Sequence, residues 1–124
     1  MNITQVIAAI RAQWAANLPD VPLHLQIGPE NAQVPYCVMN FGAISPADLT
    51  TQDRDYEVSV TFVCYSASDT ECLARMDTIS AAFDGVRFGL VYSSNLASAQ
   101  FDFNYADQAA LWSSEMPFSI RWNR

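Results

Sequence analysis

The sequence contains no lysine. Its six basic residues are all arginines and stand against thirteen aspartates and glutamates, which gives a net charge of −7. A protein that binds nucleic acid by neutralising phosphates needs a basic surface, so this composition excludes that class of function. The aromatic residues, 12% of the chain, are not interleaved with basic ones. That pattern also disfavours the stacking platforms of single-strand binders.

Long apolar runs are missing too. No stretch approaches the roughly 18 apolar residues of a membrane span, so we expect no membrane partner. Arg11 interrupts the apolar residues near the N-terminus and no basic segment precedes them, which argues against a secretory signal peptide. Of the residues, 51% are apolar and 15% are charged, as in a folded chain rather than a disordered one. The length fits a single domain spanning residues 1–124.

Cysteines are few and odd in number. The spacing of Cys37, Cys64 and Cys72 matches no zinc pattern and no CxxC redox pair. Two of them occupy apolar positions of strand-like stretches. Because free cysteine is commonly buried, the sequence predicts buried, reduced thiols and folding in a reducing cytosol.

One stretch organises the chain, namely Asp55–Tyr65 and the segment that follows it. Apolar and polar residues alternate there, which predicts a half-buried strand. Its apolar phase consists of Tyr56, Val58, Val60, Phe62 and Cys64. Next, Ser68 and Glu71 match a capping box, and we expect a helix from about Asp69 to Phe83 that Gly85 terminates. The stripe predicted for that helix consists of Leu73, Met76, Ile79, Ser80 and Phe83.

The remaining pattern completes the fold. A first helix is predicted from Asn2, as N-cap, to about Asn17, followed by strands over 22–27 and 35–41. Later strands are predicted over 86–92, 99–105 and 110–122, with 93–95 and 106–108 as connections. In the last of them Met116, Phe118, Ile120 and Trp122 share a face, and Pro117 indicates an edge strand or a bulge. The prediction is an α+β fold, an antiparallel (mixed) β-sheet with two α-helices on one face in the order α-β-β-β-α-β-β-β.

Catalytic signatures are sparse. His24 is the single histidine and lies on the polar phase of a short strand, as a solvent-facing or hydrogen-bonded histidine does. A nucleophile pair would need Cys37 or Cys64 beside it, and both occupy apolar phases that disfavour a thiolate. The nucleophile elbow, the P-loop, the HExxH motif and the Rossmann glycine pattern are all missing. We therefore expect no catalytic residue, no cofactor and no enzymatic activity.

Two acidic groups are candidates for a hard cation, Asp53/Asp55/Glu57 and Asp102/Asp107. Alternating acids on a strand are more often a solvated face, so we predict no metal site. The remaining candidates for function are surface residues that could bind another protein. Val63 and Tyr65 lie on the outer phase of the central strand. One of the two C-terminal tryptophans, Trp112 or Trp122, is a candidate for an exposed residue, but the favoured interpretation is that the helices cover these side chains and bury them. Tyrosine and tryptophan are enriched at interface anchors.

The segment Gly42–Arg54 is polar and longer than a hairpin needs, and loops of this length are often functional. Together with its surroundings it carries a resemblance. A helix with Ile3 and Trp14 on one face precedes a Val34-Pro35-Tyr36 strand start. The polar loop contains Thr50, Thr51 and Arg54; the strand 55–65 and a Ser68-capped helix follow it. Over residues 3–85 this layout resembles the tail terminator and tail-completion proteins of long-tailed bacteriophages.

The resemblance implies a non-enzymatic virion protein that is made in the host cytoplasm. It implies a homo-oligomeric, typically hexameric ring that caps the tail tube, stops its polymerisation and joins the tail to a head-side connector or stopper protein. DNA would pass through the lumen without specific binding. The residues expected at these interfaces are Asp48, Leu49, Thr50, Thr51, Gln52, Asp53 and Arg54.

Two alternatives stay open. One is another neck component, an adaptor or a stopper, which would share the ring but contact the portal side. The other is a small α+β ligand-binding or enzymatic domain, which would require a concave pocket with convergent polar groups around His24 or the Asp53/Asp55 group.

Overall fold

The computed structural model describes residues 1–26, 28, 34–46, 55–106 and 109–123. The elements are α1 (Ile3–Asn17), β1 (Leu23–Leu25), β2 (Tyr36–Phe41), β3 (Ser45–Pro46), β4 (Asp55–Ser66), α2 (Asp69–Phe83), β5 (Val91–Leu96), β6 (Gln100–Ala106) and β7 (Ala109–Asn123). The α+β prediction is confirmed, with β3 as an additional short strand. No helix in the described part of the chain is long and apolar enough to cross a membrane.

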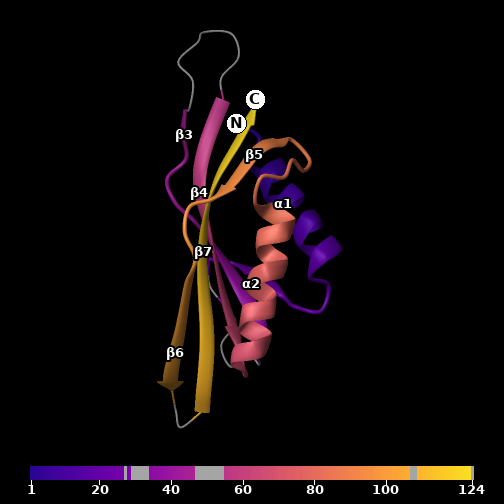
Figure 1. The fold of residues 1–124 in the computed structure, drawn as a ribbon. Helices are drawn as coiled ribbons and strands as arrows, with labels where there is room; N and C mark the ends of the chain where they lie inside the picture. Colours follow the sequence, from indigo (N-terminus) through magenta and orange to yellow (C-terminus); the bar gives the residue numbers. More distant parts are fainter. Residues whose placement is uncertain (27, 29–33, 47–54, 107–108, 124) are drawn as a thin grey trace.

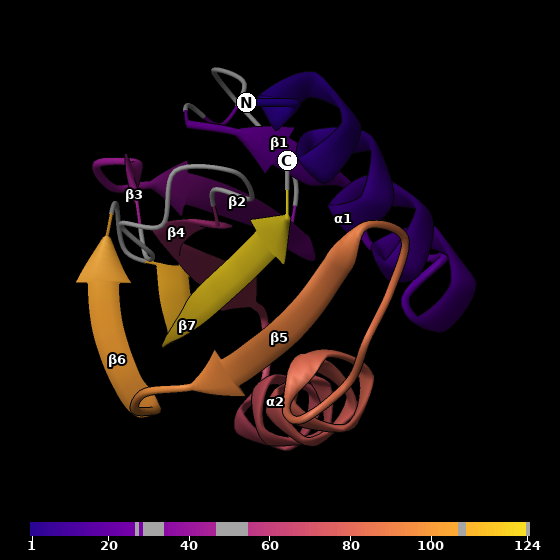
Figure 2. The ribbon, with the colours of Figure 1, turned by 90° about the horizontal axis from the view of Figure 1, so that it is seen from above.

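The two longest strands form the centre of the sheet. β4 pairs antiparallel with β7 along its whole length, from Asp55 opposite Asn123 to Ser66 opposite Trp112. The strand order is β1-β2-β4-β7-β5, with β3 beside β4 and β6 beside β7 (Figure 1). The sheet is mixed because β1 runs parallel to β2. Seen from above, β6 lies at one side of the molecule and α1 at the other (Figure 2).

Both helices cover one face of the sheet (Figure 1). Between them and the sheet lies an aromatic cluster in which the ring of Phe62 on β4 is central. Its centroid is 5.3 Å from Trp14 of α1, 4.9 Å from Phe83 of α2 and 5.6 Å from Phe118 of β7. The predicted inward set Met116, Phe118, Ile120 and Trp122 is buried. The opposite, outer face of the sheet is turned away from the helices.

Local signals placed the helix ends correctly. The Ser68 hydroxyl accepts a hydrogen bond from the Glu71 amide at 3.2 Å, as the capping box predicts. Gly85 has a φ of 68°, the left-handed conformation expected after a helix. Asn2 occupies the N-cap position of α1, but its side chain makes no capping hydrogen bond.

The predicted stripe of α2 was wrong at one position. The side chain of Leu73 is 47% exposed, and Cys72 is buried in its place. Cys72, Met76, Ile79 and Phe83 follow one another at four- and three-residue steps and form the stripe that meets the sheet. Leu73 is one residue further around the helix and therefore points towards solvent.

The strand predicted over 86–92 is also wrong. The chain makes a tight turn in which Phe88 bridges to Val91, and the strand β5 covers Val91–Leu96, where a connection was expected. The turn is forced by Gly89, which has a φ of 54° and packs directly on α1. A contact between segments eighty residues apart is invisible to a local pattern.

Pro117 lies in the central strand β7, opposite Thr61 of β4 in an unbroken register, and not in an edge strand or at a bulge as predicted. Its carbonyl accepts from the Ala97 amide at 2.8 Å, and the backbone N and O of one strand residue point to the same side. The proline nitrogen therefore faces Ala97, just past the end of β5, which pairs with β7 as far as Leu96 opposite Phe118. The missing donor lies at the end of that pairing, and Pro117 keeps its place opposite Thr61 in the β4–β7 register.

Replacing Gly89 by alanine is expected to lower the free energy of unfolding by about 2–4 kcal/mol, the sum of a left-handed backbone penalty and local overpacking. An added Cβ would lie 2.6 Å from the Cβ of Ala9. Gly85→Ala is the matched control, because its φ is also positive but no atom lies within 4 Å of the added Cβ. It should cost about 1–2 kcal/mol. Equal losses in urea unfolding would contradict the close packing of Gly89 on α1.

Candidate interaction surfaces

The predicted interface residues Asp48, Leu49, Thr50, Thr51, Gln52, Asp53 and Arg54 lie outside the described residues. The residues that precede them, Gly42–Pro46, are described and are held against the sheet. The Gly42 amide donates to the Ser59 carbonyl at 2.8 Å, and β3 pairs with Tyr56 and Glu57 of β4. The described residues on either side of this stretch, up to Pro46 of β3 and from Asp55 of β4, therefore belong to the sheet.

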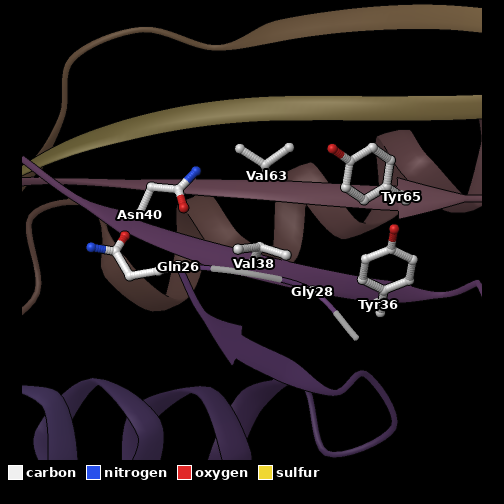
Figure 3. Close-up of a pocket in the computed structure, with 7 residues that line it drawn as sticks. All are labelled: Gln26, Gly28, Tyr36, Val38, Asn40, Val63 and Tyr65. Carbon is white, nitrogen blue, oxygen red and sulfur yellow. The ribbon is translucent and has the colours of Figure 1, made fainter. Parts of the chain in front are cut away.

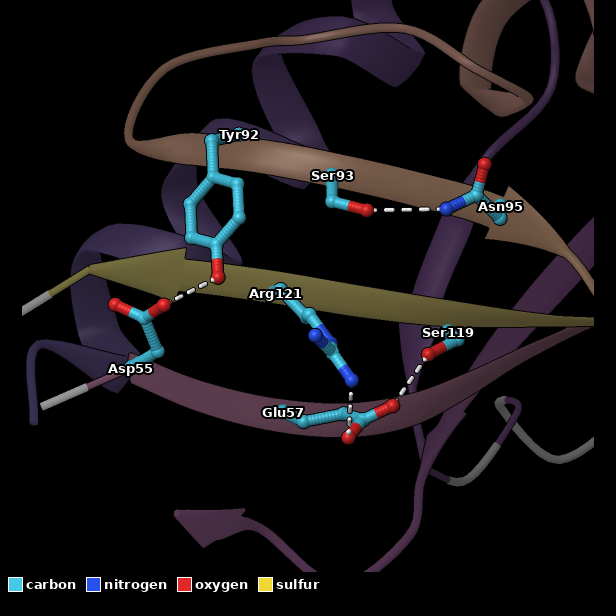
Figure 4. A network of polar contacts seen from close by, with 7 residues as sticks. All are labelled: Asp55, Glu57, Tyr92, Ser93, Asn95, Ser119 and Arg121. Carbon is cyan, nitrogen blue, oxygen red and sulfur yellow. Dashed lines mark hydrogen bonds and ion pairs between the residues drawn. The ribbon is translucent and has the colours of Figure 1, made fainter. Parts of the chain in front are cut away.

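Asp55 and Glu57, which were considered as cation ligands, are engaged by neighbouring strands on the outer face (Figure 4). The Asp55 carboxylate accepts from the Tyr92 hydroxyl at 2.7 Å and from the Asn123 amide at 2.8 Å. The hydrogen bond to Asp55 raises the pKa of Tyr92, with burial adding to the effect. These contacts tie β4 to β5 and β7, and use carboxylate oxygens that a cation would need.

The Glu57 carboxylate accepts from the Ser119 hydroxyl at 2.7 Å and pairs with the Arg121 guanidinium at 3.4 Å. Asp53 and Asp107, the other members of the two acidic groups, lie outside the described residues, whereas Asp102 is on β6. Among the described residues no three His, Cys, Asp or Glu side chains gather where they could hold a metal ion.

The cysteines differ from the prediction of reduced thiols. Cys37 on β2 and Cys64 on β4 are opposite each other in register and are joined by a disulfide. Both are fully buried. Cys72 is free and buried, and burial raises the pKa of its thiol. A raised pKa lowers the thiolate fraction.

His24, on β1, lies opposite Val38 of β2, whereas Cys37 lies opposite Leu23 and so on the other phase. The ring of His24 is 6.2 Å from the ring of Tyr36. The Cys–His nucleophile pair considered from the sequence is therefore not formed by His24 and Cys37.

A shallow groove of about 350 Å³ lies on the outer face at β2 and β4 (Figure 3). It is lined by Gln26, Gly28, Tyr36, Val38, Asn40, Val63 and Tyr65. The rings of Tyr36 and Tyr65 are 5.0 Å apart. Burial raises the pKa of Tyr36, and the neighbouring Tyr65 adds to the effect. Val63 and Tyr65 thus lie on the outer phase, as predicted, and are half-buried.

The two C-terminal tryptophans have different environments. Trp122 is fully buried and its indole donates to the Met1 carbonyl. Trp112 is half-buried beneath Phe101 and Phe103 of β6, at centroid distances of 5.1 and 4.5 Å. Those two phenylalanines are 38% and 45% exposed. Sequence reasoning singled out the tryptophans but not Phe101 and Phe103, because alternation gives the phase of a strand and not whether a helix covers it.

A second surface lies on α1. The exposed residues there include Arg11, Ala12 and Ala15, and beside them is an open hollow of about 210 Å³. It is lined by Arg11, Trp14, Ala15, Leu18, Pro19, Val21 and Leu23. The Arg11 guanidinium donates to the Leu23 carbonyl at 3.2 Å.

No protein-family model and no curated protein matches the sequence. Among solved structures, the chain is similar to one chain of the "Virion of native gene transfer agent (GTA) particle", with a TM-score of 0.68 and 14% sequence identity. The match covers 98% of this chain and 97% of that chain. Over its whole length, the protein therefore shares the fold of a chain in that virion.

Proposed function

We propose that this chain is a structural protein of a phage-like virion and has no enzymatic role. The observation that carries the proposal is the end-to-end likeness to a chain of a gene transfer agent virion, at a TM-score of 0.68. The match spans nearly all of both chains, so the likeness holds for the fold as a whole. The engaged carboxylates and the disulfide-bonded cysteines agree with a structural role.

Within the virion, the proposed role is that of the tail terminator. The chain forms a closed ring on the last ring of the tail tube, stops its polymerisation and meets the head-side connector. The resemblance of residues 3–85 to tail terminators supports this role. So does the net charge of −7, because a DNA conduit without cationic patches avoids the counterion-release attraction that would hold DNA in place.

Electron microscopy of the purified protein mixed with tail tubes tests this role. The expected result is a ring of density at one end of each tube and an arrest of further tube growth. In assembled particles, the ring should lie between tube and connector. A ring confined to the portal side of the neck would instead identify an adaptor or stopper. A protein that never binds particles or tubes would overturn the virion role itself.

The proposal makes the segment after β3 part of the contact with the tube or the next subunit. Asp48→Ala and Thr51→Ala should leave the melting temperature within about 2 °C, as surface substitutions do, and weaken tube capping by about fivefold or more. Asp77→Ala, an exposed position on α2, is the control and should cap normally. Normal capping by both loop variants would remove this segment from the interface.

A further inference from the structure

Neither helix covers the inner face of the sheet at β6 (Figure 1). Ser114 of β7 shares that face with the buried Met116, two residues further on, and lies opposite Phe101 of β6. Trp112 and Phe103 are the next pair on the same face. Phe101 and Phe103 are 38% and 45% exposed, and exposed aromatic side chains of this kind are typical anchors of protein interfaces.

Helix α2 borders this uncovered part of the sheet. Cys72 of α2 lies beside Ser114, because burial raises the pKa of the Cys72 thiol and the neighbouring Ser114 hydroxyl partly offsets that effect. Ser114 is in turn opposite Phe101. The residue that follows Cys72 on the helix is Leu73, whose side chain is 47% exposed. An exposed apolar residue of α2 therefore stands next to the helix–sheet contact that Phe101 flanks from the other side.

Leu73 lies on the flank of α2 that is turned away from α1. The other flank is identified by a hollow of about 280 Å³ against the end of α1, which α2 lines with Glu71, Ala74, Arg75 and Thr78. With roughly 3.6 residues per turn, Asp69, Leu73 and Asp77 lie across the sheet-facing stripe from those four. Figure 2 shows α1 on one side of α2 and β6 on the other, so this flank faces β6. We call Leu73, Phe101, Phe103 and Trp112 the uncovered surface.

The charges that α2 places beside the uncovered surface are acidic. Asp69 and Asp77, four residues before and after Leu73, are exposed, and helix positions four apart are neighbours. Asp102 and Glu115 do not contribute, because they alternate with the inner residues of β6 and β7 and lie on the outer face of the sheet. An occupant of matching chemistry combines an apolar stripe with cations beside it.

The helices of a second copy do not offer this combination. The chain has no lysine, and each helix has one arginine, Arg11 in α1 and Arg75 in α2. Arg75 donates to the Ser66 hydroxyl and lines the hollow towards α1. On the exposed side of α1, Arg11 is accompanied by Ala12 and Ala15 and not by large apolar side chains. The occupant is therefore a different protein, one that supplies basic residues of its own.

A helix is the element that fits beside α2. The helices α1 and α2 already form a layer over the inner face of the sheet (Figure 1), and a further helix next to α2 would extend that layer over β6. Packed helices lie roughly 8–10 Å apart, which brings one apolar stripe onto Leu73 and the aromatic rings together. Cations on the side of such a helix that faces α2 would meet Asp69 and Asp77.

We propose that the uncovered surface binds a basic amphipathic helix of another protein. The apolar stripe of that helix covers Leu73, Phe101 and Trp112, and lysines or arginines beside the stripe pair with Asp69 and Asp77. The contact is separate from the proposed terminator role, which assigns the tube to the segment after β3. Variants of the uncovered surface are therefore expected to cap tubes normally.

Binding of a synthetic helix to the purified full chain tests the proposal. The probe is a fluorescently labelled amphipathic peptide of about 14 leucines and lysines, or about four turns of helix, and fluorescence anisotropy measures its affinity. Leu73→Ser and Phe101→Ser should each weaken binding about tenfold, as loss of an interface anchor does. Asp69→Asn combined with Asp77→Asn should weaken it about fivefold and reduce its dependence on salt.

The controls make the same kinds of change elsewhere on the molecule. Leu25→Ser removes an apolar side chain of β1 that is 38% exposed, and Asp20→Asn with Glu115→Gln removes the same amount of charge from exposed positions. Both controls should bind the peptide like the wild type. Thermal melting shows whether each variant is folded. If Phe101→Ser melts early, Leu73→Ser alone decides the apolar part of the test, because it changes an exposed helix position.

Three results would overturn the proposal: a wild type that does not bind the peptide, surface variants that bind it as tightly as the wild type, or equal affinity for an analogue with glutamate in place of lysine. Equal affinity of all variants would mean that the peptide follows the net charge of the chain and not this surface. Tail-tube capping measured on the same proteins keeps the two proposals apart. A wild type that binds the peptide and caps no tubes would count against the terminator role alone.

Discussion

Replacing Phe62 by alanine is expected to lower the free energy of unfolding by about 3–5 kcal/mol, the usual cost of truncating a buried phenylalanine. The side chain is fully buried and its ring lies within 6 Å of Trp14, Phe83 and Phe118. Those three rings belong to α1, α2 and β7, so a cavity at Phe62 would loosen the packing between all the main layers. Because β4, α1, α2 and β7 all pack around this ring, none of them can fill the cavity without losing contacts with the others.

The loss corresponds to a fall in melting temperature of roughly 10–20 °C for a domain of this size. Val63→Ala is the control, because the neighbouring side chain lies on the outer face and is half-buried. It should cost about 1 kcal/mol, near the average for point substitutions. A larger loss at Val63 than at Phe62 would mean that the strand phase is shifted by one residue, which would turn the core face of β4 to solvent.

The phase of β4 was readable from the sequence because alternation over twelve residues leaves one self-consistent choice of inward face. The bounds of α2 were readable for a different reason. Its N-cap at Ser68 and its end at Gly85 depend on residues within one turn of the helix. In both cases the signal is local, and the structure agrees with the prediction.

Where the outcome depends on distant segments, prediction failed. The turn at Gly89 is set by contact with Ala9, and the exposure of Leu73 depends on how α2 is rotated against the sheet. The candidate site shows the same division. A strand over 99–105 was predicted, but the exposure of Phe101 and Phe103 on it follows from the lack of a helix over β6, which no local pattern encodes.

The disulfide is the clearest case. Cys37 and Cys64 were predicted to be buried, which they are, and reduced, which they are not. Each lies on the inward phase of its own strand, and the sequence specifies that phase. Their meeting depends on the register of β2 against β4, which places Cys37 opposite Cys64 and which the intervening loop leaves open.

Removing this disulfide with Cys37→Ala and Cys64→Ala is expected to lower the free energy of unfolding by about 3–4 kcal/mol. The two cysteines are 27 residues apart, and a cross-link that closes a loop of this length restricts the unfolded chain by about that amount. The stretch between the two cysteines includes the proposed interface residues 48–54. Reduction of the wild type should give a similar loss in urea unfolding, and the double variant should be insensitive to reductant.

A thiol count on the unfolded protein, without reductant, decides whether the bond is present. One reactive thiol, from Cys72, is expected, and three would restore the prediction from the sequence. Cys72→Ala is the control, because it removes the remaining thiol and leaves the reductant-sensitive part of the stability unchanged. Since β4 also contacts β7 along its whole length, the reduced protein should still fold. The bond therefore strengthens the pairing of β2 with β4 and is not a condition for the fold.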